Sequence, residues 1–156
     1  DLRRSRGLGD VYKRQDNTRT PFTDIAKRLL ISAGTVHVRV KKMEEAGLIK
    51  GSSLTLDYNK MGYSFIAYVG IYLEKTHQTK YVLERLKEIP YVTVAHITTG
   101  KFNIYCKVRA KTTEHAKEII FKIDDIDGIL RTETMISLEE SINDKKRLMH
   151  TIFNDL

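Results

Sequence analysis

The chain has 156 residues, of which 41% are hydrophobic and 30% charged, so it has room for one ordinary domain or two small ones. No apolar run approaches the roughly 18 residues that a membrane span needs. Cys106 is the only cysteine, which excludes an intramolecular disulfide and a Cys-x-x-Cys metal site. We expect a cytoplasmic protein with no signal peptide, no membrane partner, no metal and no other cofactor.

The net charge of +7 is concentrated near the N-terminus. Residues 1–15 carry five Arg or Lys and two Asp, and residues 16–50 carry seven basic and four acidic residues, so each segment has a net charge of +3. Residues 51–156 have a net charge of only +1. This excess of positive charge is typical of a surface that binds a polyanion. On charge alone, an excess that only keeps the chain soluble is an equally good explanation.

The first fifteen residues, DLRRSRGLGDVYKRQ, have apolar residues at spacings that match neither a helix nor a strand. The string resembles translated adaptor or read-through sequence. We therefore expect a non-native or disordered leader over 1–15, with a basic DNA-binding arm as the alternative.

A helical pattern begins at residue 20. Thr20 is expected to cap the free N–H groups of the helix, and Pro21 to take the first helical position. The apolar stripe of this helix ends near Leu29. It comprises Phe22, Ile25, Ala26 and Leu29.

A second short helix is predicted between Ser32, another capping residue, and Gly47, which suits a left-handed helix end. Its inward stripe comprises Ala33, Val36, Val40 and Met43. Its outward surface is suited to phosphates and base edges in a DNA major groove. The outward residues are Gly34, Thr35, His37, Val38, Arg39, Lys41 and Lys42. An ordinary helical hairpin with a solvated basic face is the alternative.

These residues resemble the helix-turn-helix of the leucine-responsive and asparagine regulator family, Lrp/AsnC. The resemblance rests on Ile25-Ala26, Ile31-Ser32, Val36, Arg39-Val40, Met43-Glu44 and Gly47-Leu48-Ile49-Lys50-Gly51. It implies a winged helix-turn-helix domain over 16–58, a recognition helix over 32–46 and a wing or linking strand over 49–56, followed by a hinge over 59–64. The implied DNA contacts are Ser32, Gly34, Thr35, His37, Arg39, Lys41 and Lys42.

Two features depart from the family pattern. Leu30 stands where the family often has Gly, so the turn must form without the residue that most easily adopts a positive φ. Residues 1–15 do not supply the amphipathic first helix of the family, which would leave Ile25, Val36 and Val40 partly uncovered.

The segment 65–140 alternates between strand and helix signals. Phe65–Leu73 is apolar on both faces, and Val82, Leu83, Leu86 and Ile89 form a helical stripe that Pro90 ends. Strands are expected over 92–98 and 102–109, with a turn at 99–101. A second helix begins at Thr112 or Thr113 and ends before Gly128, and a last strand covers 131–139. The inward stripe of this second helix comprises Ala116, Ile119, Ile120 and Ile123.

This order predicts an α+β chain whose second domain is a ferredoxin-like βαββαβ fold, with both helices on one face of an antiparallel sheet. The other face is left bare. We therefore expect a homodimer with its sheets face to face, which would also present two recognition helices to pseudo-palindromic double-stranded DNA.

The second domain resembles the regulation-of-amino-acid-metabolism domain of the same family. That resemblance implies octamers or larger rings and an effector site between subunits, at a turn where the family has Gly-x-x-Asp. Here Asn103 replaces the Asp and offers no full negative charge to an ammonium group. The expected contacts with an amino acid or similar metabolite are Thr98, Thr99, Gly100, Lys101, Asn103, Thr132, Thr134 and Ser137. A plain hairpin is the alternative for the turn residues, and the tail 141–156 is expected to form a short final helix.

Two other functions fit the same fold. A siroheme-decarboxylase-like enzyme would use His96, His115, Arg109 or Arg131 over a tetrapyrrole, but their spacing forms no nucleophile–base pair, carboxylate dyad or metal cluster. An effector-binding module without DNA binding is the other alternative. We expect a transcriptional regulator without catalytic residues.

Overall fold

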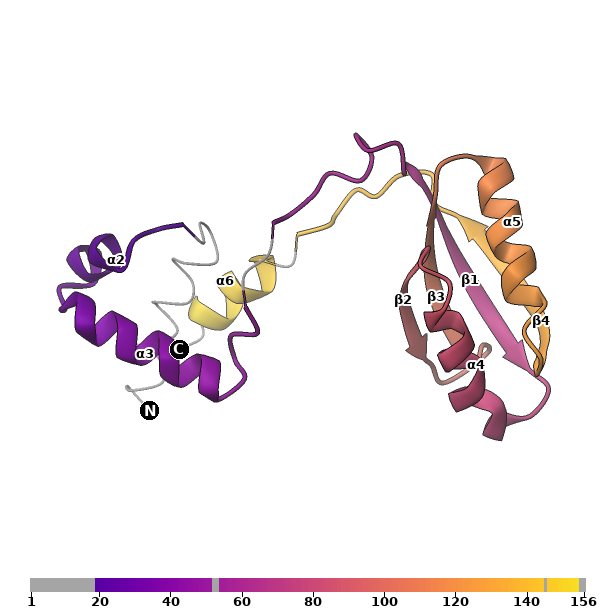
Figure 1. Ribbon diagram of the computed structural model, residues 1–156, viewed down its shortest axis with the longest axis horizontal. Helices are drawn as coiled ribbons and strands as arrows, with labels where there is room; N and C mark the ends of the chain where they lie inside the picture. The colour runs from indigo at the N-terminus through magenta and orange to yellow at the C-terminus, as the bar shows by residue number, and fades with distance from the viewer. Residues whose placement is uncertain (1–18, 52–53, 145, 155–156) are drawn as a thin grey trace. The chain divides into compact units, whose positions relative to one another are not determined.

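The computed structural model describes residues 19–51, 54–144 and 146–154. The chain divides into two compact units. The first takes residues up to Thr55 together with those from Ile142 onward, and the second is Leu56–Ser141. Figure 1 labels the elements of both. The leader expected over 1–15 lies outside the described residues, and the expected hinge over 59–64 falls inside the second unit.

The first unit contains the helices α2 (Phe22–Leu29), α3 (Ala33–Glu45) and α6 (Lys146–Asn154). Its buried core joins the stripes of α2 and α3, as their periodicity predicted. The core residues are Ile25, Ala26, Val36, Val40 and Met43. The helix predicted in the tail is confirmed by α6.

The turn between α2 and α3 is built on Leu30 and Ser32. Leu30 caps α2 in the left-handed region, at φ 54° and ψ 43°, so the turn does form without glycine. Ser32 caps α3 as expected, because its Oγ accepts the Thr35 N–H at 3.0 Å. The expected cap at Thr20 is wrong: Pro21 is the N-cap residue, and its carbonyl oxygen accepts the Asp24 N–H at 3.0 Å.

The end of α3 is closed at Gly47, which has φ 71°. Two bonds close it, from the Gly47 N–H to the Glu44 oxygen at 3.0 Å and from the Leu48 N–H to the Met43 oxygen at 2.9 Å. The strand expected over 49–56 is not formed by its described residues, 49–51 and 54–56. Gly51 has φ 130°, which breaks an extended run.

The second unit is a four-stranded antiparallel sheet with strand order β2-β3-β1-β4. Its elements are β1 (Phe65–Leu73), η1 (Thr76–Gln78), α4 (Thr79–Lys87), β2 (Val92–Ile97), β3 (Ile104–Ala110), α5 (Thr113–Asp124) and β4 (Ile129–Ile136). Figure 1 shows α4 and α5 lying against the sheet, and one core joins both helices to β1 and β3. The ferredoxin-like order is confirmed, with Thr112 capping α5.

The last strand lies at 129–136 rather than at the expected 131–139. Its length is set by β1, because Leu73 pairs with Ile129 and Ala67 pairs with Ile136. Gly128, at φ 92°, makes the turn directly before it. Within the described segments no helix combines the length and apolar character needed to cross a membrane.

Candidate functional site

The exposed surface of α3 carries two neighbouring stripes at helical spacing. One stripe is Gly34, His37, Val38 and Lys41, and the other is Thr35, Arg39 and Lys42. All of these residues are exposed except Thr35 and Arg39, which are half-buried. The structure therefore brings the predicted DNA-contacting residues of α3 onto one continuous basic surface.

Two of these residues also have structural roles. The Thr35 hydroxyl lies 2.7 Å from Ser32 Oγ, so both hydroxyls are engaged at the start of α3. The His37 ring packs edge-on against Phe22 of α2, with centroids 5.7 Å apart. That contact orients an otherwise exposed imidazole.

The β2–β3 turn is bonded to the end of β1 through Asn103. The Asn103 N–H donates to the Ile71 oxygen at 2.9 Å, and Asn103 Oδ1 accepts the Leu73 N–H at 2.9 Å. Thr98 closes the turn by donating its hydroxyl to the Phe102 oxygen at 2.8 Å. Gly100 has φ 94° and permits the reversal. The side-chain oxygen of Asn103 therefore already serves the sheet backbone.

The hydroxyls expected on the last strand do not join this turn. Thr132 pairs with Ile71 on the helix-covered face, and its hydroxyl donates to Asp124 Oδ1 at 2.7 Å. Thr134 lines a groove of about 180 Å³ beside α5. The Ser137 N–H bonds the Ile66 oxygen, at the opposite end of β1. Within one subunit the eight predicted residues therefore do not form a single group, because alternation along β4 turns Thr132 and Thr134 toward α5 and Ser137 follows the far end of that strand.

A charged cluster lies beside the turn, and sequence reasoning missed its central residue, Glu133. Glu133 accepts hydrogen bonds from Lys101 Nζ at 2.7 Å and from the Tyr72 hydroxyl at 3.0 Å. Arg131 Nη2 lies 3.7 Å from the same carboxylate, and its guanidinium stacks 4.1 Å from the Tyr72 ring centre. The hydrogen bond from Lys101 lowers the pKa of Glu133, and that bond raises the pKa of Lys101. Both groups stay charged at neutral pH.

The face of the sheet away from the helices, here called the open face, is aromatic. The rings of Tyr68 and Tyr105 stack with centroids 5.7 Å apart. Phe102 lies between Tyr105 and Tyr72, with centroid distances of 5.9 Å and 5.2 Å. A continuous aromatic strip therefore runs along β1 and β3 and ends at the charged cluster.

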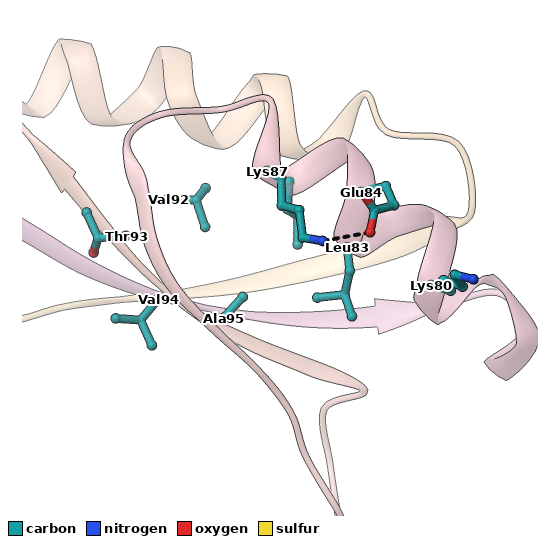
Figure 2. A pocket seen from close by; sticks show the side chains of 9 residues that line it. Lys80, Leu83, Glu84, Lys87, Val92, Thr93, Val94 and Ala95 are labelled. Carbon is teal, nitrogen blue, oxygen red and sulfur yellow. Dashed lines mark hydrogen bonds and ion pairs between the residues drawn. The ribbon is translucent and has the colours of Figure 1, made fainter. Parts of the chain in front are cut away.

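A groove of about 400 Å³ lies between α4 and the edge strand β2. Leu83, Leu86 and Val92 line it, and Figure 2 shows the ion pair between Lys87 and Glu84 beside it. None of the predicted DNA or effector residues lines this groove.

The four residues considered for an enzyme have separate surroundings. His115 packs against Tyr91 and its Nδ1 accepts the Lys111 N–H, while Arg109 bonds Asn59. Arg131 stacks on Tyr72, and His96 of β2 pairs with Tyr105 of β3. In the part of the chain that the structure describes, no three His, Cys, Asp or Glu side chains are grouped to hold a metal.

Two family models match the chain. Residues 66–146 match the Lrp/AsnC ligand binding domain, and residues 15–50 match a winged helix-turn-helix DNA-binding domain. Among curated proteins, the regulatory protein AsnC of Haemophilus influenzae is 37% identical over 127 residues, which cover 81% of this chain and 85% of that protein.

Two solved structures share the fold. That of E. coli AsnC superposes with a TM-score of 0.87 at 32% identity and covers 89% of this chain and 94% of that one. A feast or famine regulatory protein from M. tuberculosis, complexed with L-methionine, superposes with a TM-score of 0.79 at 22% identity, covering 87% and 92%. By these matches and by the order of its two units, the chain belongs to the Lrp/AsnC family of DNA-binding transcriptional regulators.

Proposed function

We propose that this chain is a homodimeric regulator that reads a pseudo-palindromic DNA site with α3 and responds to an amino acid bound at the β2–β3 turn. The observation that carries the proposal is the continuous basic surface of α3, held by a buried core of its own. Gly34, His37 and Val38, nearest the helix N-terminus, are assigned to base edges. Lys41 and Lys42 are assigned to phosphates.

The DNA-binding claim is tested by selecting bound duplexes from a random library with the full chain. We expect enrichment of two half-sites separated by about one helical turn, roughly 10 base pairs, or a multiple of it. His37→Ala should change the selected bases, whereas His77→Ala, on η1 of the second unit, should leave them unchanged. Failure of the wild-type chain to enrich any sequence would contradict the proposal.

The dimer is assigned to the open face. Its strip of Tyr68, Tyr105 and Phe102 is an aromatic surface of the kind that proteins cover with a partner. Tyr68→Asp should give a monomer in analytical ultracentrifugation, because it places a charge within that strip. Tyr81→Asp, at an exposed position on α4, should remain a dimer. A wild-type chain that is monomeric at micromolar concentration would overturn this assignment.

The effector is assigned to the amino-acid class. The complex of a solved relative with L-methionine supports that class. Because the Asn103 oxygen is already bonded to the Leu73 N–H, we assign the ligand ammonium group to Glu133 and its carboxylate to Lys101 and Arg131. The site lies at the edge of the proposed dimer face.

A thermal-shift screen of the twenty amino acids tests this assignment, since a ligand that binds only the folded chain raises Tm. Glu133→Gln should abolish the shift produced by the best amino acid. The matched control is Glu84→Gln, which removes an exposed carboxylate also paired with a lysine at 2.7 Å. Retention of the shift in Glu133→Gln would contradict the assignment.

A further inference from the structure

The segment 57–63 is a tightly hydrogen-bonded turn. Asp57 Oδ1 accepts the N–H groups of Asn59 and Lys60 at 3.1 Å and 3.2 Å. The Tyr63 N–H donates to the Tyr58 oxygen at 2.9 Å. This turn therefore holds the Asn59 side chain and the Tyr63 carbonyl in fixed positions.

Arg109 of β3 binds both of those groups. Its Nη1 donates to Asn59 Oδ1 at 2.9 Å and to the Tyr63 oxygen at 2.8 Å. Its guanidinium also lies 5.6 Å from the Tyr58 ring centre. The Arg109 side chain is only 14% exposed, so these bonds are better shielded from water than those of an ordinary surface arginine.

The same arginine also lies close to Glu140, near the C-terminal end of the second unit. Arg109 Nη2 lies 3.9 Å from Glu140 Oε1, and Lys107 binds Glu140 directly through its other oxygen. Glu140 and Lys107 are 23% and 18% exposed. Because the second unit runs from Leu56 to Ser141, Arg109 contacts the chain close to both of its connections with the first unit.

We propose that Arg109 is a positioning residue that holds the chain at both ends of the second unit (the sensor unit), where it leads to the first unit (the DNA-binding unit), and so sets the half-site spacing that the regulator accepts. The inference rests on the proposed function. A guanidinium serves this role because its planar donors bind several acceptors at once, which the point charge of lysine does not. Arg109 is not part of the buried core, which contains residues such as Val69 and Ile104, so an Arg109 variant should keep the fold of the unit.

The test uses full-length Arg109→Lys and Glu140→Gln. The first readout is amide hydrogen exchange, which should quicken at 56–63 in Arg109→Lys and at 137–141 in both variants, with the exchange of β1 and β3 unchanged. Arg85→Lys is the matched control, because it alters an exposed Arg–Glu pair, Arg85 with Glu88 at 2.6 Å, whose two residues lie outside the segments 56–63 and 137–141.

The second readout is binding to duplexes that carry one or two selected half-sites. Affinity for a single half-site should stay within about twofold of wild type, because α3 is untouched. The wild-type preference for the best spacing over one shifted by half a helical turn, about 5 base pairs, should fall roughly tenfold in Arg109→Lys.

The outcomes separate the two ideas. Unchanged exchange at 56–63 in Arg109→Lys, or an unchanged spacing preference, overturns the positioning role. A wild-type chain that binds no duplex overturns the proposed function, and the exchange readout then decides whether Arg109 holds the connections.

Discussion

The Phe102 ring lies so close over Gly70 that a Cβ on Gly70 would stand 2.4 Å from two of its carbon atoms. Gly70→Ala should therefore displace Phe102 from Tyr72 and Tyr105 and lower the free energy of unfolding by about 1–3 kcal/mol. Urea denaturation measures the loss. In a Phe102→Ala background the same substitution should cost far less, and an equal cost in both backgrounds would contradict this contact as the cause.

Leu30 holds a left-handed conformation that costs a residue with a Cβ about 1–2 kcal/mol. Its side chain is 93% exposed, so Leu30→Gly loses almost no packing. After the added entropy of the unfolded glycine, we expect a gain of up to about 1 kcal/mol in the free energy of unfolding. Leu48→Gly, at an exposed leucine without a positive φ, should give no gain. A higher urea midpoint in Leu30→Gly alone is the expected result.

Lys41 is assigned to a DNA phosphate, which predicts a change in salt dependence. Lys41→Gln should reduce the slope of log Kobs against log salt by about 1 and weaken binding uniformly across sequences. Lys80→Gln removes an exposed lysine of α4 and should leave the slope unchanged. Equal slopes for Lys41→Gln and wild type would remove Lys41 from the interface.

Burial raises the pKa of the Cys106 thiol from 9.0 to about 12. The folded thiol should therefore resist iodoacetamide at pH 8 and react once the chain is unfolded in urea. Because the unfolded thiol loses its proton first, its contribution to stability is full below pH 9 and is lost as the pH rises toward 12. Cys106→Ala should show a shallower fall in Tm over that range, and an identical fall would contradict the shift.

Much of the fold could be predicted because the core depends on periodicity. The stripes through Ile25 and Val36 in the first unit, and through Leu86 and Ile119 in the second, are the residues that the structure buries. Strand ends were predicted less well. The ends of β4 depend on its pairing with β1, and local residue preferences carry no information about that pairing.

To predict the residues near the proposed effector site, the strand register is needed as well as the side-chain periodicity. Thr132 and Glu133 are adjacent in sequence, yet one hydroxyl faces α5 and the neighbouring carboxylate meets Lys101. Only the pairing of Gly70 with Glu133 reveals which face each occupies. The bonds of Arg109 to Asn59 and Glu140 join residues far apart in the chain, and no local pattern marks them.

The first unit is built from residues that come before and after the second unit in the sequence, and α6 follows the last strand of the sheet. During synthesis α2 and α3, which share a core of their own, leave the ribosome first, then the second unit, and α6 last. The first unit would therefore be completed only after the ligand-binding part of the same molecule has had time to form.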